Sequence, residues 1–319
     1  MLTIRSSDIR RGSSWAKPAA MTLALLVALA SAANAQQSFK SAEEAATALV
    51  DAARNGDRKA MLTVLGRDGA EIISSGDAVA DAATRERFLA AYDAKHQVQS
   101  EGDKATLVVG QDDFPFPIPL MRKNNAWQFD TAAGREEILY RRVGRNELNA
   151  IQTSLAYVDA QNEYAEKGIA GKGAYAQRIV SRPGQKDGLY WPAQPGEEQS
   201  PLGDLAAAAA KEGYRAGQQA QPYHGYYYKI LTRQGGRAQG GELDYVVGGK
   251  MIGGFALVAY PAEYGNSGVM TFLVNHQGVV YQKDLGPDTD RIATHMTAFN
   301  PDKTWQRASD REQPQAQTR

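Results

Sequence analysis

The sequence contains no cysteine among its 319 residues. Disulfide bonds, a thiol nucleophile, thiolate metal sites and a lipid-modified cysteine are therefore all excluded. The sequence also has no excess of either charge, because 36 basic residues balance 36 acidic ones. A nucleic-acid-binding protein normally gathers a basic surplus on one face, so the composition predicts no nucleic-acid partner. With 43% hydrophobic residues, the chain is long enough for two domains with separate cores.

Long hydrophobic runs are missing too, apart from one near the N-terminus. Residues 21–32 read MTLALLVALASA, which is well short of the ~20 residues that a membrane-spanning helix needs. The run follows a basic leader and precedes the small-x-small cleavage site Ala33-Asn34-Ala35. Residues 1–35 are therefore predicted to be a signal peptide that is cleaved after Ala35. We expect a periplasmic or secreted protein with no stable membrane span after cleavage.

The segments after this leader predict helices first and strands second. Ser41 and Glu44 have the spacing of a capping box, which marks a helix start. A longer helical pattern runs from Thr131 to Lys167, and Gly144 is expected to break it into two helices. This order predicts a small α+β domain over 36–144, similar to folds of the nuclear-transport-factor-2 type. The helical patterns cover 41–55, 57–65 and 81–96, and the strand-like runs cover 104–110, 116–123 and 126–130.

The second half predicts a long helix and an antiparallel sheet over 145–298. An alanine-rich helix is expected at 200–214, with Ser200 as its N-cap. Turns rich in glycine or asparagine separate the runs that follow. The tail, 299–319, loses apolar residues and is expected to be disordered. The strand-like runs are 223–234, 254–262, 269–275 and 279–286, with a further short strand within 241–253.

Several long motifs carry a family resemblance. The segments NELNAIQTSLAYVDAQNEYA, YHGYYYKILTRQG and GGKMIGGFALVAYPAEYGNSGVMTFLVN resemble a family of secreted bacterial proteins known as domain of unknown function 2950. The resemblance covers roughly 38–300 and implies an exported protein with no assigned activity and no catalytic residues to carry over. The C-terminal half also resembles the globular part of pilins and pseudopilins, where a helix with a Y-x-x-A-Q-x-x-Y pattern precedes an antiparallel sheet. That pattern is formed here by Tyr157, Ala160, Gln161 and Tyr164.

The stretch QPYHGYYYKIL (221–231) holds four tyrosines and one of the four histidines of the chain. Tyrosine is a favoured strand residue, so the stretch is first of all one strand of the sheet. Exposed tyrosines can also stack on a sugar or another envelope component. The candidates for such a ligand surface are Tyr226, Tyr228, Tyr260 and Tyr264.

Two further groups are candidates for chemistry. His224 and Ser267 are a candidate base and nucleophile, since a serine needs a base within hydrogen-bond reach. Asp284, Asp288 and Asp290 offer carboxylate oxygens to a cation, although the EF-hand spacing is absent.

No pattern implies a cofactor. We therefore expect a non-catalytic binding or assembly module of the cell envelope, whose partner is a protein or a glycan. The alternative is a periplasmic hydrolase that acts on envelope glycan or peptide.

Overall fold

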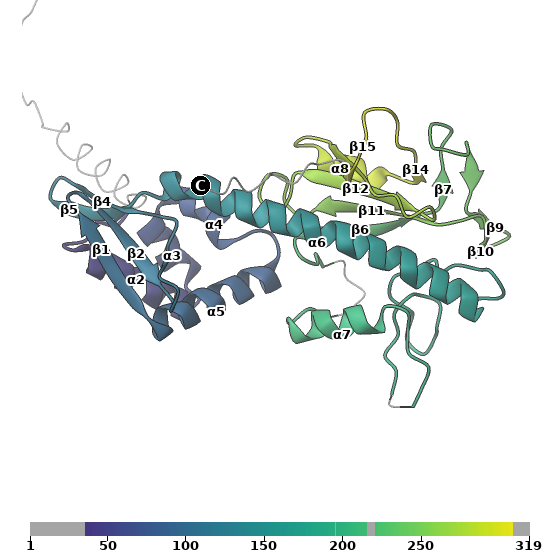
Figure 1. The fold of residues 1–319 in the computed structure, drawn as a ribbon, viewed down its shortest axis with the longest axis horizontal. Coiled ribbons are helices and arrows are strands. Elements are labelled where there is room, and N and C mark those ends of the chain that lie inside the picture. Colours follow the sequence, from purple (N-terminus) through teal and green to yellow (C-terminus); the bar gives the residue numbers. More distant parts are fainter. Residues whose placement is uncertain (1–35, 195, 216–220, 309–319) are drawn as a thin grey trace, which may run out of the picture.

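The computed structural model describes residues 36–194, 196–215 and 221–308. The expected signal peptide and its cleavage site lie outside these residues. Helices and antiparallel sheets occur in both halves of the chain, so the α+β class predicted from the sequence is confirmed. One long helix, α6 (Thr131–Lys167), runs along both halves (Figure 1). No helix in the described ranges combines the length and the apolar character needed to cross a membrane.

The N-terminal region packs its helices against one antiparallel sheet. In that sheet the strand order is β1-β2-β4-β5, and β3 pairs with β2. The helices are α2 (Ala42–Arg54), α3 (Arg58–Leu65), α4 (Ala70–Ile73) and α5 (Ala78–Ala94), with a 3-10 turn at Arg67–Gly69. The strands are β1 (His96–Glu101), β2 (Lys104–Val109), β3 (Phe114–Pro115), β4 (Leu120–Lys123) and β5 (Ala126–Phe129).

Local sequence signals explain where these helices begin. The Ser41 hydroxyl accepts a hydrogen bond from the Glu44 N–H, and the Glu44 carboxylate accepts one from the Lys40 N–H. Both bonds satisfy donors that a helix start leaves open. Asp57 and Asp77 cap α3 and α5 in the same way. One strand was missed, because β1 begins at His96, where the helical pattern was expected to end.

The expected break at Gly144 does not occur, because α6 is continuous over 37 residues. Asp130 caps its start, and Gly168, with φ of 67°, ends it in a left-handed conformation. Gly144 is exposed in the middle of the helix. A single glycine costs a helix only about 1 kcal/mol relative to alanine, and packing against both halves of the chain outweighs that cost.

The C-terminal region is built on a five-stranded antiparallel sheet with the order β15-β13-β12-β11-β6. A second, three-stranded sheet has the order β14-β7-β8, and β9 and β10 form a separate hairpin. The helices are α7 (Gly203–Lys211) and α8 (Thr289–His295). The strands are β6 (Tyr226–Leu231), β7 (Arg233–Gln234), β8 (Leu243–Asp244), β9 (Val246–Val247), β10 (Lys250–Met251), β11 (Ala256–Pro261), β12 (Met270–Asn275), β13 (Tyr281–Asp284), β14 (Ala298–Phe299) and β15 (Gln306–Arg307).

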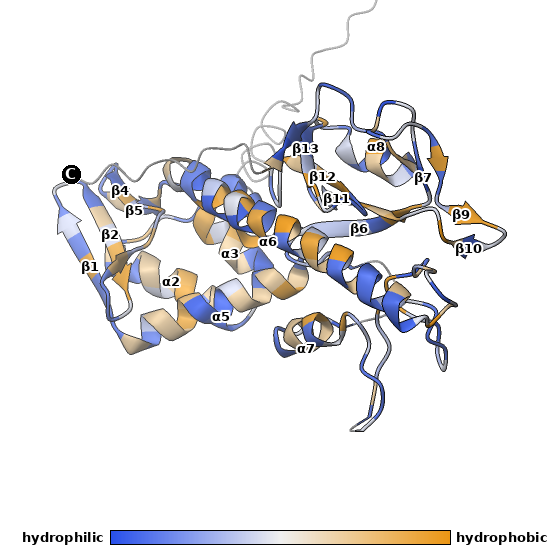
Figure 2. Cartoon of the chain, turned by 45° about the vertical axis from the view of Figure 1, so that its right-hand side comes forward, coloured by the Kyte–Doolittle hydropathy of each residue, from blue (hydrophilic) through white to orange (hydrophobic). Residues whose placement is uncertain are grey.

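The core of this region is centred on β11, in which every residue is buried. A strand buried on both faces reads as a continuous apolar run, as ALVAYP does. Helix α6 contacts β11 and β12, and α8 contacts β11. The hydropathy colours of Figure 2 show apolar residues along β11 and β12.

Two expectations for this half are corrected. Helix α7 begins at Gly203, three residues after Ser200, and no side chain caps it. The tail is ordered further than expected, because β14 pairs with β7 and β15 pairs with β13. Phe299 is buried and Trp305 packs against the core, so the few apolar residues of this segment are enough to anchor it. Residues 309–319 of the expected disordered tail lie outside the described ranges.

Candidate functional site

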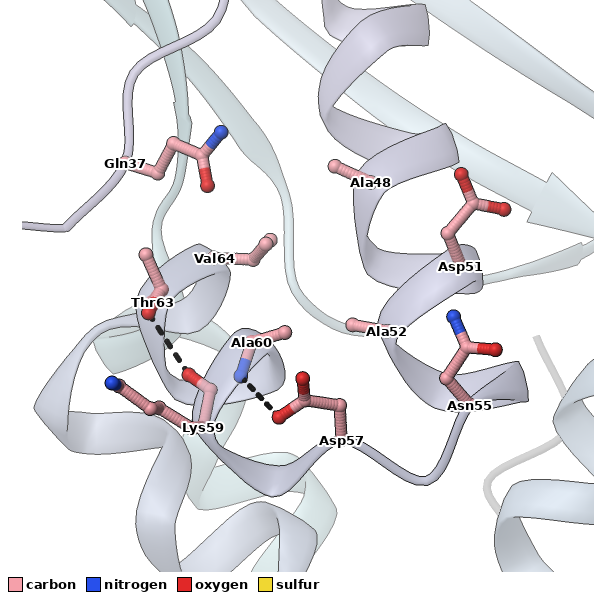
Figure 3. A pocket seen from close by; sticks show the side chains of 10 residues that line it. All are labelled: Gln37, Ala48, Asp51, Ala52, Asn55, Asp57, Lys59, Ala60, Thr63 and Val64. Atoms are coloured by element: carbon pink, nitrogen blue, oxygen red, sulfur yellow. Dashed lines mark hydrogen bonds between the residues drawn. The ribbon is translucent and has the colours of Figure 1, made fainter.

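The N-terminal region has a shallow hollow of about 420 Å³ between α2 and α3 (Figure 3). Three of its lining residues are alanines, and its polar groups serve the helices themselves. The Asp57 carboxylate accepts from the Ala60 N–H, and the Thr63 hydroxyl donates to the Lys59 carbonyl. No set of polar side chains converges on this space, so it is not the best candidate for a site.

A cavity of about 470 Å³ in the C-terminal region has a different lining. Its walls are apolar and aromatic, with only a few polar groups, as in most small-molecule sites. We call it the tyrosine cavity. The rings that line it belong to Tyr157, Tyr190, Tyr214, Tyr223, Tyr227, Tyr228 and Tyr260, and the aliphatic walls include Ile179, Val180, Leu202, Leu205 and Leu257.

Three elements position these side chains. Strand β6 is the last strand of its sheet and contributes Tyr227 and Tyr228. Helix α6 contributes Thr153 and Tyr157, while α7, which lies beside α6 in Figures 1 and 2, contributes apolar residues such as Leu205. Because successive strand residues point to opposite faces, a cavity at the sheet edge can receive neighbours from both faces.

The hydroxyl of Tyr228 differs from the other polar groups of the cavity in its hydrogen bonding. It is buried and makes no hydrogen bond of standard geometry with any described residue. Thr153 is close enough to oppose the effect of burial on the pKa of Tyr228, but burial dominates and raises that pKa. Burying a hydroxyl group without a hydrogen-bond partner destabilises the folded protein by about 1–3 kcal/mol. A ligand atom that accepts a hydrogen bond from the Tyr228 hydroxyl would remove this cost.

The cavity offers little charge to a ligand. Burial raises the pKa of Tyr157, Tyr223 and Tyr260, so these phenols stay neutral. The Lys229 ammonium group donates to the carbonyls of residues 294 and 296, which lie at the end of α8. Arg215 remains as a cationic side chain at the wall. The arrangement therefore suits an apolar ligand that carries few polar groups.

Of the four tyrosines expected at a ligand surface, two line this cavity. Tyr228 and Tyr260 are among its walls. Tyr226 is fully buried, and its hydroxyl donates to the Met270 carbonyl at 2.9 Å. Tyr264 lies in the turn after β11, where its hydroxyl donates to Asp284 at 3.2 Å.

The candidate base and nucleophile are placed as parts of turns. Ser267 is fully buried, and its hydroxyl exchanges hydrogen bonds with the backbone N–H and carbonyl of Glu263. His224 lies in the turn before β6 with φ of 50°, and its Nε2 is 3.3 Å from a carboxylate oxygen of Glu212. Both hydrogen-bonding positions of the serine are thus filled by backbone, and the histidine faces an acid on another segment.

The three candidate aspartates do not converge either. Asp284 accepts hydrogen bonds from the Gly286 N–H and from Tyr264. Asp288 pairs with Arg291 at 3.1 Å, and Asp290 lies in the first turn of α8. Within the described ranges, no group of three or more histidines and acids is arranged to hold a metal ion.

Sequence reasoning missed a set of buried or half-buried polar residues where the two regions meet. We call this set the polar joint; it consists of Asp77, Arg142, Asn146, Tyr214 and Asn266. One oxygen of Asp77 accepts from the Tyr214 hydroxyl at 2.9 Å and from the Gly225 N–H at 2.8 Å. Burial, followed by the Asp77 charge, raises the pKa of Tyr214. The only local signal was the N-cap position of Asp77.

The polar joint is completed on α6. The Arg142 guanidinium donates to the carbonyls of Glu71 and Ile72 and to the side chain of Asn266. Asn146 donates to the Ser267 carbonyl at 2.9 Å. These bonds link the segment before α5, the middle of α6 and the turn between β11 and β12. Nothing in the spacing of these residues could have paired them.

The chain was compared with known proteins at three levels. No curated protein matches it, and no solved structure matches it. One family model matches residues 36–308, which is most of the chain. The chain therefore belongs to the family described as protein of unknown function (DUF2950).

Proposed function

We propose that this protein is a non-catalytic binding module of the cell envelope and that its ligand occupies the tyrosine cavity. The observation that carries this proposal is a cavity of about 470 Å³ with apolar walls and one buried, poorly satisfied hydroxyl on Tyr228. Concave, mostly apolar sites with a few placed polar groups are typical of small-molecule binding.

The lining selects the chemistry of the ligand. Aromatic rings favour flat or aliphatic surfaces, and their burial supplies roughly 25 cal/mol for each Å² removed from water. The neutral phenols favour a ligand that carries a hydrogen-bond acceptor near Tyr228. We infer a small molecule with an apolar body and one acceptor group. A free glycan, with hydroxyls on every side, would leave too many polar groups unsatisfied here.

The location is part of the proposal and rests on the first 35 residues of the sequence. The basic leader, the short apolar run and Ala33-Asn34-Ala35 support export to the periplasm or beyond. The likeness of the C-terminal half to pilin globular domains is carried by α6 preceding an antiparallel sheet, and it remains a hypothesis. The surroundings of Ser267 give no support to a hydrolase.

Filling the cavity tests the proposal. Ala209 of α7 lines it, whereas Ala207 of the same helix is exposed and does not. We would titrate the protein without its leader with anilinonaphthalene sulfonate, a fluorescent probe with apolar rings and one sulfonate group, and then displace the probe with long-chain alcohols. Ala209→Phe should weaken probe binding about tenfold or more, because the larger ring occupies space that the probe needs and removes apolar contact area.

Ala207→Phe is the matched control and should leave binding unchanged. Tyr228→Phe should keep the probe but weaken the alcohols that use the hydroxyl. The proposal fails if the probe does not bind, or if the two phenylalanine variants behave alike.

A further inference from the structure

A second hollow, of about 390 Å³, lies on the other side of Tyr214, which lines both spaces. Its walls come from α5, from α6 and from the side chains of Glu212, Tyr214 and His224. It differs from the tyrosine cavity because most of its side chains are polar or charged. We call it the arginine cleft and define it by Thr84, Arg87, Arg145, Asn149, Glu212 and His224.

The acids of the arginine cleft already have partners. The Asp81 carboxylate accepts from the Ser75 hydroxyl at 2.7 Å and from the Ser75 N–H at 3.0 Å. The Glu212 carboxylate lies 3.3 Å from His224. Neither acid forms an ion pair with an arginine of the described residues.

The arginines around the cleft fall into two kinds. Arg142 is held by two carbonyls and by Asn266. Burial lowers its pKa, and the charges of Asp81, Glu263 and Glu71 oppose that shift. Arg87 and Arg145 have no such compensation, because neither makes an ion pair with any residue that the structure describes. The Arg87 guanidinium donates only to the Thr84 hydroxyl, at 3.0 Å.

The pKa of Arg145 is lowered in these surroundings. Burial lowers its pKa first, and the neighbouring charge of Arg87 lowers it further. Arg87 and Arg145 carry like charges and line the same space, so an anion placed between them would relieve their repulsion. The two acids of the cleft, Asp81 and Glu212, are held by Ser75 and His224 instead. The side chain of Asn149, on the same wall, adds amide donors.

We propose that the arginine cleft binds a small dianion of the phosphate class, held between Arg87 of α5 and Arg145 of α6. Each guanidinium presents a planar fork of N–H donors that matches two oxygens of a phosphate. Thr84 and Asn149 supply further donors to the remaining oxygens. The space is larger than a phosphate ion alone, so a phosphorylated small molecule fits as well as the free ion.

The site also crosses the boundary between the two regions. Arg87 belongs to the N-terminal region, whereas Glu212 and His224 belong to the C-terminal one. A ligand that binds only the folded protein stabilises it in proportion to its concentration. Bound phosphate therefore raises the unfolding temperature, and it does so whether or not the tyrosine cavity is occupied.

The test uses the whole chain after its leader at low ionic strength, where screening of exposed charges is weakest. Isothermal titration with inorganic phosphate should give a single site. Arg87→Gln and Arg145→Gln should each weaken binding about tenfold, the value of one charge-assisted hydrogen bond of the usual strength. Arg58→Gln, an equal loss of charge at an exposed position of α3, is the matched control and should not change the affinity.

Titrations with glycerol phosphate, sulfate and succinate identify the chemical class of the anion that binds. Glycerol phosphate that binds more tightly than phosphate supports a phosphorylated small molecule as the natural ligand, and the reverse order supports the free ion. Equal binding of sulfate or succinate overturns the phosphate class, because charge alone would then account for the affinity. The proposal also fails if phosphate does not bind, or if Arg58→Gln weakens binding as much as Arg145→Gln. Circular dichroism of each variant confirms that the fold is kept.

Discussion

The N-terminal and C-terminal regions are filled in different ways. The N-terminal core is divided into three clusters and depends heavily on alanine, as in α2, where Ala45, Ala46 and Ala52 are buried. The C-terminal core is one continuous cluster with many aromatic rings, and its tyrosines include Tyr157, Tyr164, Tyr226 and Tyr245.

This difference explains where the main cavity lies. Small side chains on α2 leave an open hollow of about 420 Å³ beside α3, on which no set of polar side chains converges. Large rings that meet edge to face, such as Tyr157 and Phe255 at 5.6 Å, pack around fixed angles. Where α7 meets β6, the tyrosine rings enclose a hollow. Polar residues, not a shared hydrophobic core, join the two regions. A substitution in one core can therefore be studied separately from the other core.

Alkaline pH should separate the two regions most strongly. Burial raises the pKa of Tyr157 and Tyr228 and raises the pKa of Tyr245 to about 12, whereas unfolded tyrosine titrates near 10. Between these values the unfolded chain releases protons that the folded chain keeps. Stability is therefore full below about pH 10 and falls as the pH rises from there toward 12, because the folded chain resists losing these protons.

Variants with a single tryptophan can locate this loss. Trp127 lies in the N-terminal sheet and Trp191 in the C-terminal core. Urea unfolding from neutral pH to about pH 12 should lower the midpoint reported by Trp191 before that reported by Trp127. The reverse order would mean that the buried phenols do not control the alkaline limit.

The sequence predicted those features that local patterns encode. Ser41 and Glu44 predicted the start of α2, and the apolar run 254–262 predicted the strand that is β11. The polar joint could not be predicted, because the partners of Asp77 are 137 and 148 positions away. Of the candidate site, the tyrosine-rich stretch 221–231 predicted a strand that carries Tyr226 and Tyr228. It could not tell that β6 is an edge strand or that α7 covers it.

Matched truncations of the two cores should give the next largest difference. Phe255 is fully buried and lies 4.7 Å from the Tyr175 ring, so Phe255→Ala should cost about 3–5 kcal/mol. Leu49→Ala, in the alanine-rich core, should cost less, about 2–3 kcal/mol, because fewer large neighbours lose contacts. Chemical denaturation of both variants measures the two costs. A larger cost for Leu49→Ala would show that the N-terminal core is the more tightly packed one.

Breaking the polar joint should have a smaller effect. Asp77 caps α5 through Val79 and Ala80 and also accepts from Tyr214 and Gly225. Asp77→Ala removes all four bonds and should cost about 2–3 kcal/mol. Asp57→Ala, which removes a cap alone, should cost about 1 kcal/mol and is the matched control.

The excess of the first cost over the second measures how strongly the two regions are coupled. A cycle that combines Asp77→Ala with Tyr214→Phe isolates the part carried by that hydrogen bond. If Asp77→Ala and Asp57→Ala lowered the free energy of unfolding equally, Asp77 would act only as a helix cap and would not couple the two regions.

The smallest expected change concerns α6, which joins the two regions. A Cβ at Gly144 would meet nothing within 4 Å, whereas a Cβ at Gly134 would lie 2.6 Å from the Pro117 carbonyl oxygen. Gly144→Ala should therefore stabilise the protein by about 0.5–1 kcal/mol, since alanine loses less backbone entropy in a helix. Gly134→Ala should destabilise it, because backbone atoms must move. If Gly144→Ala were neutral or harmful, α6 would not be one continuous helix in solution, and the two regions would be joined by a hinge.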